Sequence, residues 1–317
     1  MISMIIPRRH GIILYAGLSI FTYCLSLPGN AAMDGDGPSQ SIEASGPSRI
    51  VSAGGSITEI LYALGLKDRI AAVDTTSLYP ATAMKEHPNI GYVRALSSEG
   101  LLSVKPTLIL AEADAGPKDV IDQLQSASVA FVTVPDKTSP DGIAEKIRFI
   151  GKAVGKNTES EALATQVLED FDALKVQLAD LKDRPKVLFI LSTAGGRMLA
   201  GGEGTSADEM IRLAGGKNAL TNFKGYKQVN SEAVISAAPD VVLMMTRGDT
   251  AHSLGEAILD DPAIAQTPAG KARRLVTMDG LYLLVFGPRT AHAAAALAAK
   301  LHPDADIKSL PERPWTK

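Results

Sequence analysis

A short stretch of this chain occurs twice, and a repeated supersecondary unit constrains the possible folds more than any other feature of the sequence. The copies are Leu96–Leu110 and Val229–Leu243. Each copy predicts a short helix that begins near its Glu, a break at its Pro and a buried strand in the apolar run that follows. Two copies so far apart predict two similar lobes. The identical positions are Ser98, Glu99, Ser103 and Pro106, matched by Ser231, Glu232, Ser236 and Pro239.

Strand and helix patterns alternate along most of the chain. The 317 residues are enough for two domains, each with its own core. Such alternation predicts an α/β fold with mainly parallel sheets that helices cover on both faces. We expect strands at 49–52, 70–73, 130–134, 186–191 and 274–277, and helices at 58–64, 118–126, 140–153, 206–213 and 290–301.

The middle of the chain predicts one long amphipathic helix at 157–184. Thr158 and Glu161 have the spacing of a capping box, and about 24 helical residues at ~1.5 Å each would span roughly 36 Å. We interpret this helix as a rigid connection between an N-terminal lobe (49–156) and a C-terminal lobe (185–303), with a ligand cleft between the lobes; a simple surface helix is the alternative. The remaining residues, 304–317, are expected to form a loose tail. Apolar residues recur at steps of three and four at Leu163, Val167, Phe171, Leu174, Leu178 and Leu181.

The first 32 residues have the pattern of a secretory signal peptide. Arg8 and Arg9 precede an apolar run at 11–27, and small residues at 29–32 suit cleavage. An uncleaved membrane anchor is the alternative. A flexible leader is expected at 33–48, and the exported protein would lie in the periplasm. The only cysteine, Cys24, falls within the signal, so the mature chain would have no disulfide, thiolate metal site or cysteine nucleophile.

Charge and motifs exclude several classes of function. The formal net charge of −3 gives no indication of nucleic-acid binding. The G-x-S-x-G, HExxH and CxxC motifs are absent from the sequence, so nothing positive favours an exported enzyme. In open α/β lobes, ligands bind beyond the carboxyl ends of the strands. The loops at those ends are 74–80, 111–117, 192–204, 246–252 and 278–288.

Four segments together resemble the haem-binding proteins of bacterial haem ABC importers: Val73–Pro80, Ile90–Gly100, Gly195–Met198 and Met278–Arg289. The wider group also binds cobalamin and iron-siderophores, and its two lobes are bridged by one long helix. The resemblance covers roughly residues 48–303. It implies a monomeric, non-enzymatic periplasmic protein that captures haem b for iron uptake and delivers it to a homodimeric permease with its ATPase.

The resemblance implies that Tyr79 is the axial ligand of the haem iron. Fe(III) is a hard ion, and a tyrosine phenolate is an established haem ligand. A free phenol titrates near ~10, so it needs the metal and a nearby cation to ionise at neutral pH. In the family an arginine of the second lobe has that role, and Arg247 stands at the matching strand end.

Other haem contacts are open. Arg94 and Arg197 are candidates for the propionates, or form ordinary ion pairs; Tyr282 and Phe286 pack on the porphyrin, or belong to the core. We expect one haem, because no histidine fits a second axial site: His252 lies in a charged loop, and His87, His292 and His302 are assigned to the surface, a helix and the tail.

The resemblance also gives the repeated glutamates a role, because one glutamate on each lobe of such proteins docks into arginines of the permease. Glu99 and Glu232 are the matched positions, and a carboxylate presented twice suits a two-fold partner. The alternative is that both complement helix dipoles. Glu59 and Glu209 are a second pair of matching positions in the two halves, but they are less suited to docking.

The nearest rival function is cobalamin or siderophore binding on the same fold. A Zn or Mn carrier is disfavoured for want of a His/carboxylate set.

Overall fold

The computed structural model describes residues 46–127, 129–246 and 256–316. The expected signal peptide and Cys24 therefore lie outside the described residues. Within these three ranges, no helix combines the length and the apolar character that a membrane crossing requires.

The N-terminal lobe is built on a parallel sheet in the order β2-β1-β3-β4. β1 pairs with β3 from Ile50 opposite Leu108 to Ala53 opposite Ala111. Both strands are apolar and almost wholly buried, as expected for strands covered on both faces. The strands are β1 (Ile50–Ala53), β2 (Ile70–Val73), β3 (Leu108–Glu112) and β4 (Ala130–Val134), and the helices include α1 (Gly55–Ala63), α3 (Ser98–Ser103), α4 (Lys118–Gln125) and α5 (Pro140–Val154).

The C-terminal lobe contains a mixed sheet in the order β10-β9-β5-β6-β8. β10, β9 and β5 are parallel, whereas β6 is antiparallel to both of its neighbours. Residues 198–201 were expected to lie in the loop 192–204, but they form β6, which folds back on β5 through Gly195 and Gly196 with positive φ. The strands are β5 (Lys186–Ser192), β6 (Met198–Gly201), β7 (Lys217–Asn218), β8 (Tyr226–Val229), β9 (Val241–Thr246) and β10 (Leu275–Asp279); the helices include α7 (Ser206–Leu213), α8 (Ser231–Ala237), α11 (Gly280–Leu284) and α12 (Thr290–Leu301).

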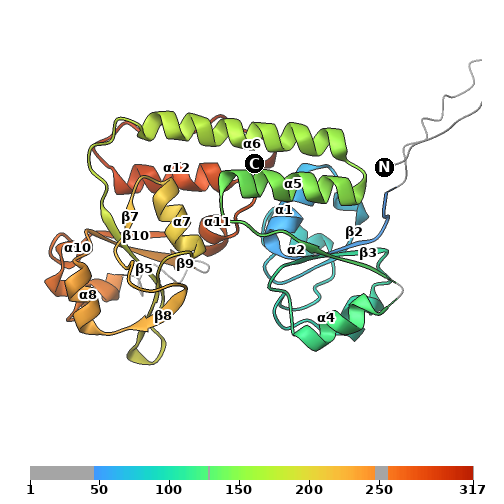
Figure 1. Ribbon diagram of the computed structural model, residues 1–317, viewed down its shortest axis with the longest axis horizontal. Helices are drawn as coiled ribbons and strands as arrows, with labels where there is room; N and C mark the ends of the chain where they lie inside the picture. Colours follow the sequence, from blue (N-terminus) through green and yellow to red (C-terminus); the bar gives the residue numbers. More distant parts are fainter. Residues whose placement is uncertain (1–45, 128, 247–255, 317) are drawn as a thin grey trace, which may run out of the picture. The chain divides into compact units, whose positions relative to one another are not determined.

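The long helix α6 (Asn157–Leu178) packs along α5 and α12 (Figure 1). Its expected apolar face is correct: the five residues from Leu163 to Leu178 in the heptad-like pattern are buried. The expected capping box is wrong, because Lys156 precedes the helix and makes no side-chain cap. Glu161 instead pairs with Arg148 of α5, Oε2 to Nε 2.7 Å.

The expectation of a loose tail is also wrong. Arg313 forms a two-point ion pair with Asp170 of α6, and Gln177 exchanges hydrogen bonds with the backbone of Lys308. Asp170 is fully buried on α6, and a buried carboxylate requires a partner. His302, which was assigned to the tail, is buried at the end of α12. The C-terminal residues therefore belong to the folded structure.

One hydrophobic cluster runs through both lobes. It includes α1 and α5 residues of the N-terminal lobe, α7 and α12 residues of the C-terminal lobe, and the buried face of α6. Smaller clusters cover the remaining face of each sheet. The two lobes are therefore joined by packed hydrophobic side chains as well as by the helix α6.

Candidate functional site

A buried polar cluster fixes the loop that follows β2. The Asp74 carboxylate accepts hydrogen bonds from the Gly54 amide (3.1 Å), the Thr76 hydroxyl (2.8 Å) and the Ser77 hydroxyl (3.0 Å). Ser77 is in turn 2.7 Å from the Thr58 hydroxyl of α1. Burial raises the pKa of Asp74, and the bonds from Thr76 and Ser77 oppose that rise. The loop is therefore held from its first residues onward.

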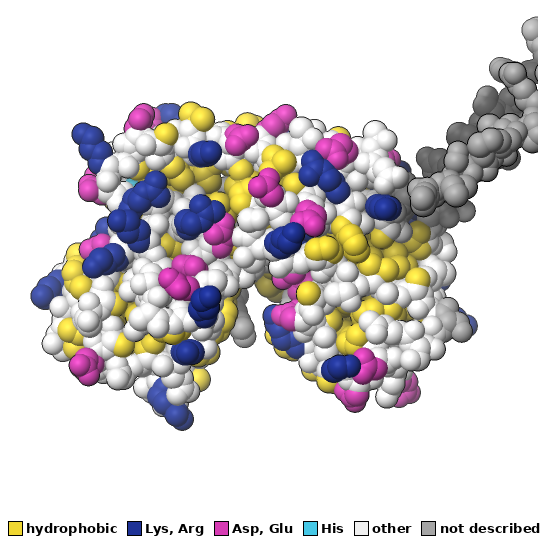
Figure 2. Space-filling model, in the orientation of Figure 1, with side chains coloured by type: hydrophobic (Ala, Val, Ile, Leu, Met, Phe, Trp, Pro, Cys, Tyr) yellow, Lys and Arg dark blue, Asp and Glu magenta, His cyan; other side chains and the backbone are white. Residues whose placement is uncertain are grey.

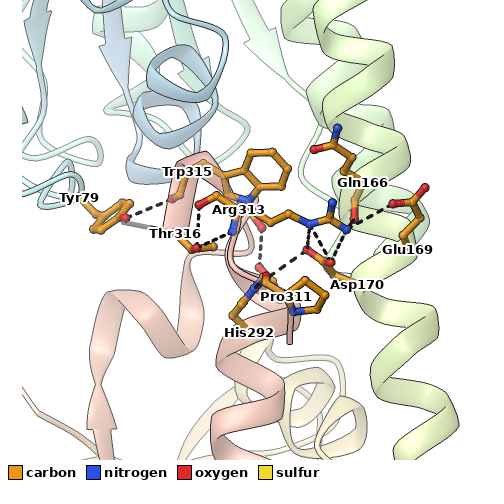
Figure 3. A network of polar contacts seen from close by, with 11 residues as sticks. Tyr79, Gln166, Glu169, Asp170, His292, Pro311, Arg313, Trp315 and Thr316 are labelled. Atoms are coloured by element: carbon orange, nitrogen blue, oxygen red, sulfur yellow. Dashed lines mark hydrogen bonds and ion pairs between the residues drawn. The ribbon is translucent and has the colours of Figure 1, made fainter. Parts of the chain in front are cut away.

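This loop presents the half-buried side chain of Tyr79. The Cζ of Arg289 lies 3.4 Å from the centroid of its ring. The Tyr79 hydroxyl donates a hydrogen bond to the carbonyl of Trp315, 3.1 Å away (Figure 3). Burial raises the pKa of Tyr79, the positive charge of Arg289 lowers it, and the negative charge of Glu59 raises it again. Arg289 is thus a cation placed to favour the phenolate form.

Sequence reasoning missed the role of Arg289. This residue immediately precedes α12, and its guanidinium reaches across to Glu59 of α1: Nε to Oε2 is 3.1 Å and Nη2 to Oε1 is 2.5 Å. Glu59 is only 6% exposed. Burial raises the pKa of Glu59, whereas the hydrogen bond and charge of Arg289 lower it. The sequence signal for this ion pair was Glu59 itself, the one charged residue of α1, which lies between Ile57 and Ile60.

A second buried cation, Lys146 of α5, also joins the lobes. Its Nζ lies 2.6 Å from Asp136 Oδ1, 3.3 Å from the Ser56 hydroxyl and 3.3 Å from the Phe286 carbonyl. Ser56 donates to Glu112, at the carboxyl end of β3, over 3.0 Å. Burial raises the pKa of Glu112 to about 7. Nothing in the local pattern identified these residues.

The two expected propionate ligands are exposed, and both are engaged with neighbours in the same lobe. Arg94 forms an ion pair with Asp114 and a hydrogen bond to the Tyr92 hydroxyl. Arg197 donates to Gln228, Nη1 to Oε1 3.4 Å. The structure does not bring either arginine to Tyr79.

The two expected porphyrin contacts differ in position. The Tyr282 ring centroid lies 5.0 Å from the Cζ of Arg289, so Tyr282 belongs to the same group as Tyr79. Phe286 is 2% exposed and packs in the hydrophobic core. Its ring is therefore not available at a surface. Arg247 and His252 lie outside the described residues.

The repeated glutamates occupy matching positions in the two lobes. Ser97 caps α3 and Asn230 caps α8, because each side chain accepts a hydrogen bond from the backbone amide three residues later. Lys105 and Ala238, each directly before the repeated Pro, share a positive φ of 49° and 45°. The Glu99 and Glu232 side chains are exposed, and no ion pair or side-chain hydrogen bond engages either one in the part of the chain that the structure describes.

The surface carries mixed charge. Figure 2 shows Lys and Arg interspersed with Asp and Glu, and a notch between the two lobes on the visible face. Among the described residues, no group of three or more His, Cys, Asp or Glu could hold a metal ion.

Comparison with known proteins gives a consistent picture. A family model described as "Periplasmic binding protein" matches residues 50–281. The periplasmic heme-binding protein BhuT, solved with two hemes, is 39% identical and has a TM-score of 0.77; the match covers 80% of this chain and 98% of BhuT. The periplasmic heme-binding protein RhuT from Roseiflexus sp. RS-1, solved in apo form, is 38% identical with a TM-score of 0.77 and coverage of 81% and 99%.

Two further relatives extend the comparison. The uncharacterized ABC transporter substrate-binding lipoprotein YvrC of Bacillus subtilis is 29% identical over 261 residues, 81% of each protein. A vitamin B12-binding protein of Yersinia pestis is 28% identical over 205 residues, 64% of this chain and 71% of that protein.

Proposed function

This chain belongs to the periplasmic binding protein family, and we propose that it captures haem outside the cytoplasm and delivers it to an ABC importer. The observation that carries the proposal is the half-buried phenol of Tyr79 beneath the guanidinium of Arg289, at 3.4 Å. The similarity to heme-binding BhuT and RhuT supports haem as the cargo. The chain would bind and release haem b without breaking bonds in it.

The local chemistry suits a ferric iron. A phenolate is a hard anionic ligand for Fe(III), and the nearby positive charge of Arg289 lowers the pKa of Tyr79 against the effect of burial. Glu59 holds that guanidinium in place through two hydrogen bonds. Arg289 is therefore the phenolate partner that geometry supports, while Arg247 stays a second candidate on the resemblance alone.

Haem also needs an apolar or aromatic surface. Tyr282, half-buried beside Arg289, is the aromatic candidate whose position supports contact with a porphyrin bound at Tyr79. Each arginine keeps further N–H donors besides those used on its present partners, so both Arg94 and Arg197 stay candidates for the propionates. We propose one haem per chain, bound through Tyr79.

Delivery would use the exposed carboxylates Glu99 and Glu232. Their matched settings on α3 and α8 present the same group twice, which suits a homodimeric permease with its ATPase. YvrC, described as an ABC transporter substrate-binding lipoprotein, supports this class of partner. An exported monomer carrying haem for iron uptake is the resulting proposal for the whole protein.

A hemin titration of the purified protein tests the function. The parent should shift the Soret band and develop a tyrosinate-to-iron charge-transfer band. Tyr79→Phe should lose the charge-transfer band and bind more weakly, whereas Tyr62→Phe, which removes a hydroxyl bonded to Glu86, should behave as the parent.

Cyanocobalamin provides the competing arm, because a vitamin B12-binding relative favours that second candidate. Binding of cyanocobalamin with no response to hemin would replace the haem proposal by the cobalamin one. Unchanged hemin spectra in Tyr79→Phe would remove Tyr79 as the ligand.

A further inference from the structure

The C-terminal segment 311–316, here called the strap, is anchored on two helices (Figure 3). Arg313 binds the fully buried Asp170 of α6, with Nη2 to Oδ1 at 2.7 Å and Nε to Oδ1 at 3.0 Å. His292 of α12 bonds the carbonyl of Pro311 through Nε2, at 3.0 Å. A two-point bond to a buried carboxylate is a strong anchor.

The end of the strap reaches the candidate iron ligand. Its last turn, Pro314–Thr316, contacts α1 of the N-terminal lobe, and Trp315 packs partly buried against the main core. The Trp315 carbonyl accepts the hydrogen bond from the Tyr79 hydroxyl. The strap thus connects the anchor on α6 with the one oxygen that haem iron would use.

Iron and the strap need opposite states of this oxygen. A phenol that donates to a carbonyl keeps its proton, and this bond favours the neutral form. A phenolate bound to Fe(III) has no proton to donate, and its negative oxygen would face the negative end of the carbonyl dipole. The Tyr79–Trp315 bond must therefore break when iron binds, with the phenol proton released to solvent.

We propose that the strap competes with the cargo iron for the Tyr79 oxygen, so that haem capture includes release of the Trp315 carbonyl. This inference rests on the proposed function, because it concerns the same ligand. Among the described residues, Arg289, Glu59 and Tyr282 also act electrostatically on Tyr79. None of these belongs to the strap, so changes to the strap leave them in place.

Arg313→Ala removes the anchor, and Lys308→Ala is the matched control. Lys308 lies in the same C-terminal region, and its side chain pairs with the exposed Asp306. Without its anchor, the strap should leave Tyr79. The hemin dissociation constant at pH 7 should then fall about three- to tenfold, as expected for loss of one competing hydrogen bond.

Trp315 reports the strap directly, because it is the only tryptophan of the chain. In the haem-free protein, Arg313→Ala should make Trp315 fluorescence more accessible to iodide, and Lys308→Ala should not. If Arg313→Ala does not fold, a chain that ends at Arg313 is the second variant, since it keeps the Asp170 pair and removes the Trp315 carbonyl. It should show the same changes in hemin binding.

The outcomes separate the two proposals. If the parent binds hemin as tightly as the strap variants, or more tightly, the strap proposal is overturned. The haem function stays intact in that case. The absence of any Soret response in the parent would overturn the haem function and the strap proposal together.

Discussion

Arg289 and Glu59 form a buried two-point ion pair between the two lobes, with Nη2 to Oε1 at 2.5 Å and Nε to Oε2 at 3.1 Å. The pair fixes the guanidinium whose Cζ lies 3.4 Å from the Tyr79 ring centroid. One interaction therefore serves both the junction of the lobes and the setting of the candidate ligand.

Arg289→Ala should destabilise the protein by about 3 kcal/mol, at the low end of the range for breaking a buried pair. Urea unfolding at pH 7 measures the change. Arg212→Ala is the control, since it breaks an exposed pair with Glu209 within α7 and should cost less than about 1 kcal/mol. Equal losses in the two variants would contradict the role assigned to the buried pair.

Glu59→Gln combined with Arg289→Ala should recover part of the stability that Arg289→Ala loses. The double variant removes the uncompensated buried charge, and neighbouring groups in one pair are not additive. The same urea experiment measures the coupling. Additive losses would mean that Glu59 and Arg289 do not act as a pair.

Independently, Arg289→Ala should shift the pH midpoint of the tyrosinate–haem band upward, because the cation that lowers the pKa of Tyr79 is gone.

Glu112 should make the folded protein less stable as the pH rises. Burial raises its pKa to about 7, above the ordinary value of 4.5, so the folded state holds this proton more tightly than the unfolded state does. Its contribution is full below about pH 4.5 and is lost as the pH rises through 7. The unfolding free energy of Glu112→Gln minus that of the parent should therefore increase between these pH values.

Glu161→Gln is the control for this pH series. Its hydrogen bond to Arg148 lowers the pKa of Glu161, so its contribution is present above the unfolded pKa and is lost as the pH falls through the folded one. The difference curve of Glu161→Gln should thus be flat between pH 5 and 8. A flat curve for Glu112→Gln would show that the carboxyl does not retain its proton near neutrality.

Phe171→Ala should destabilise the protein by about 3 to 5 kcal/mol, because it opens a cavity where α6 meets the shared core. Val176→Ala on the same helix changes a side chain that is 74% exposed and should stay within about 0.5 kcal/mol. Thermal or urea unfolding measures both. Similar small effects would argue that α6 is a surface helix rather than a structural link.

Glu99→Ala together with Glu232→Ala should abolish haem-dependent growth through the importer while leaving hemin binding unchanged, because both carboxylates are exposed. Asp141→Ala with Asp172→Ala removes two other exposed acids, on α5 and α6, and should not affect transport. Loss of hemin binding in the first double variant would assign Glu99 and Glu232 a structural role.

The sequence by itself determined the elements whose pattern is local. Strands β2 and β4 and helices α7 and α12 begin and end at the expected residues. Their patterns of apolar residues depend only on neighbouring positions in the sequence. The repeated stretch also predicted a short helix and a strand in each copy, and the structure contains them as α3 with β3 and α8 with β9. Tyr79 came from the resemblance to a family, since a tyrosine before a proline has no distinctive local pattern.

Only the tertiary structure decided which side chains meet. Arg289 and Glu59 are 230 residues apart, and Trp315 and Tyr79 are 236 apart. Such partners are selected by the packing of both lobes and α6, and no spacing rule in the sequence encodes them. The same reason explains why the C-terminal residues were expected to be loose: Arg313 is anchored only because α6 buries Asp170 beside it.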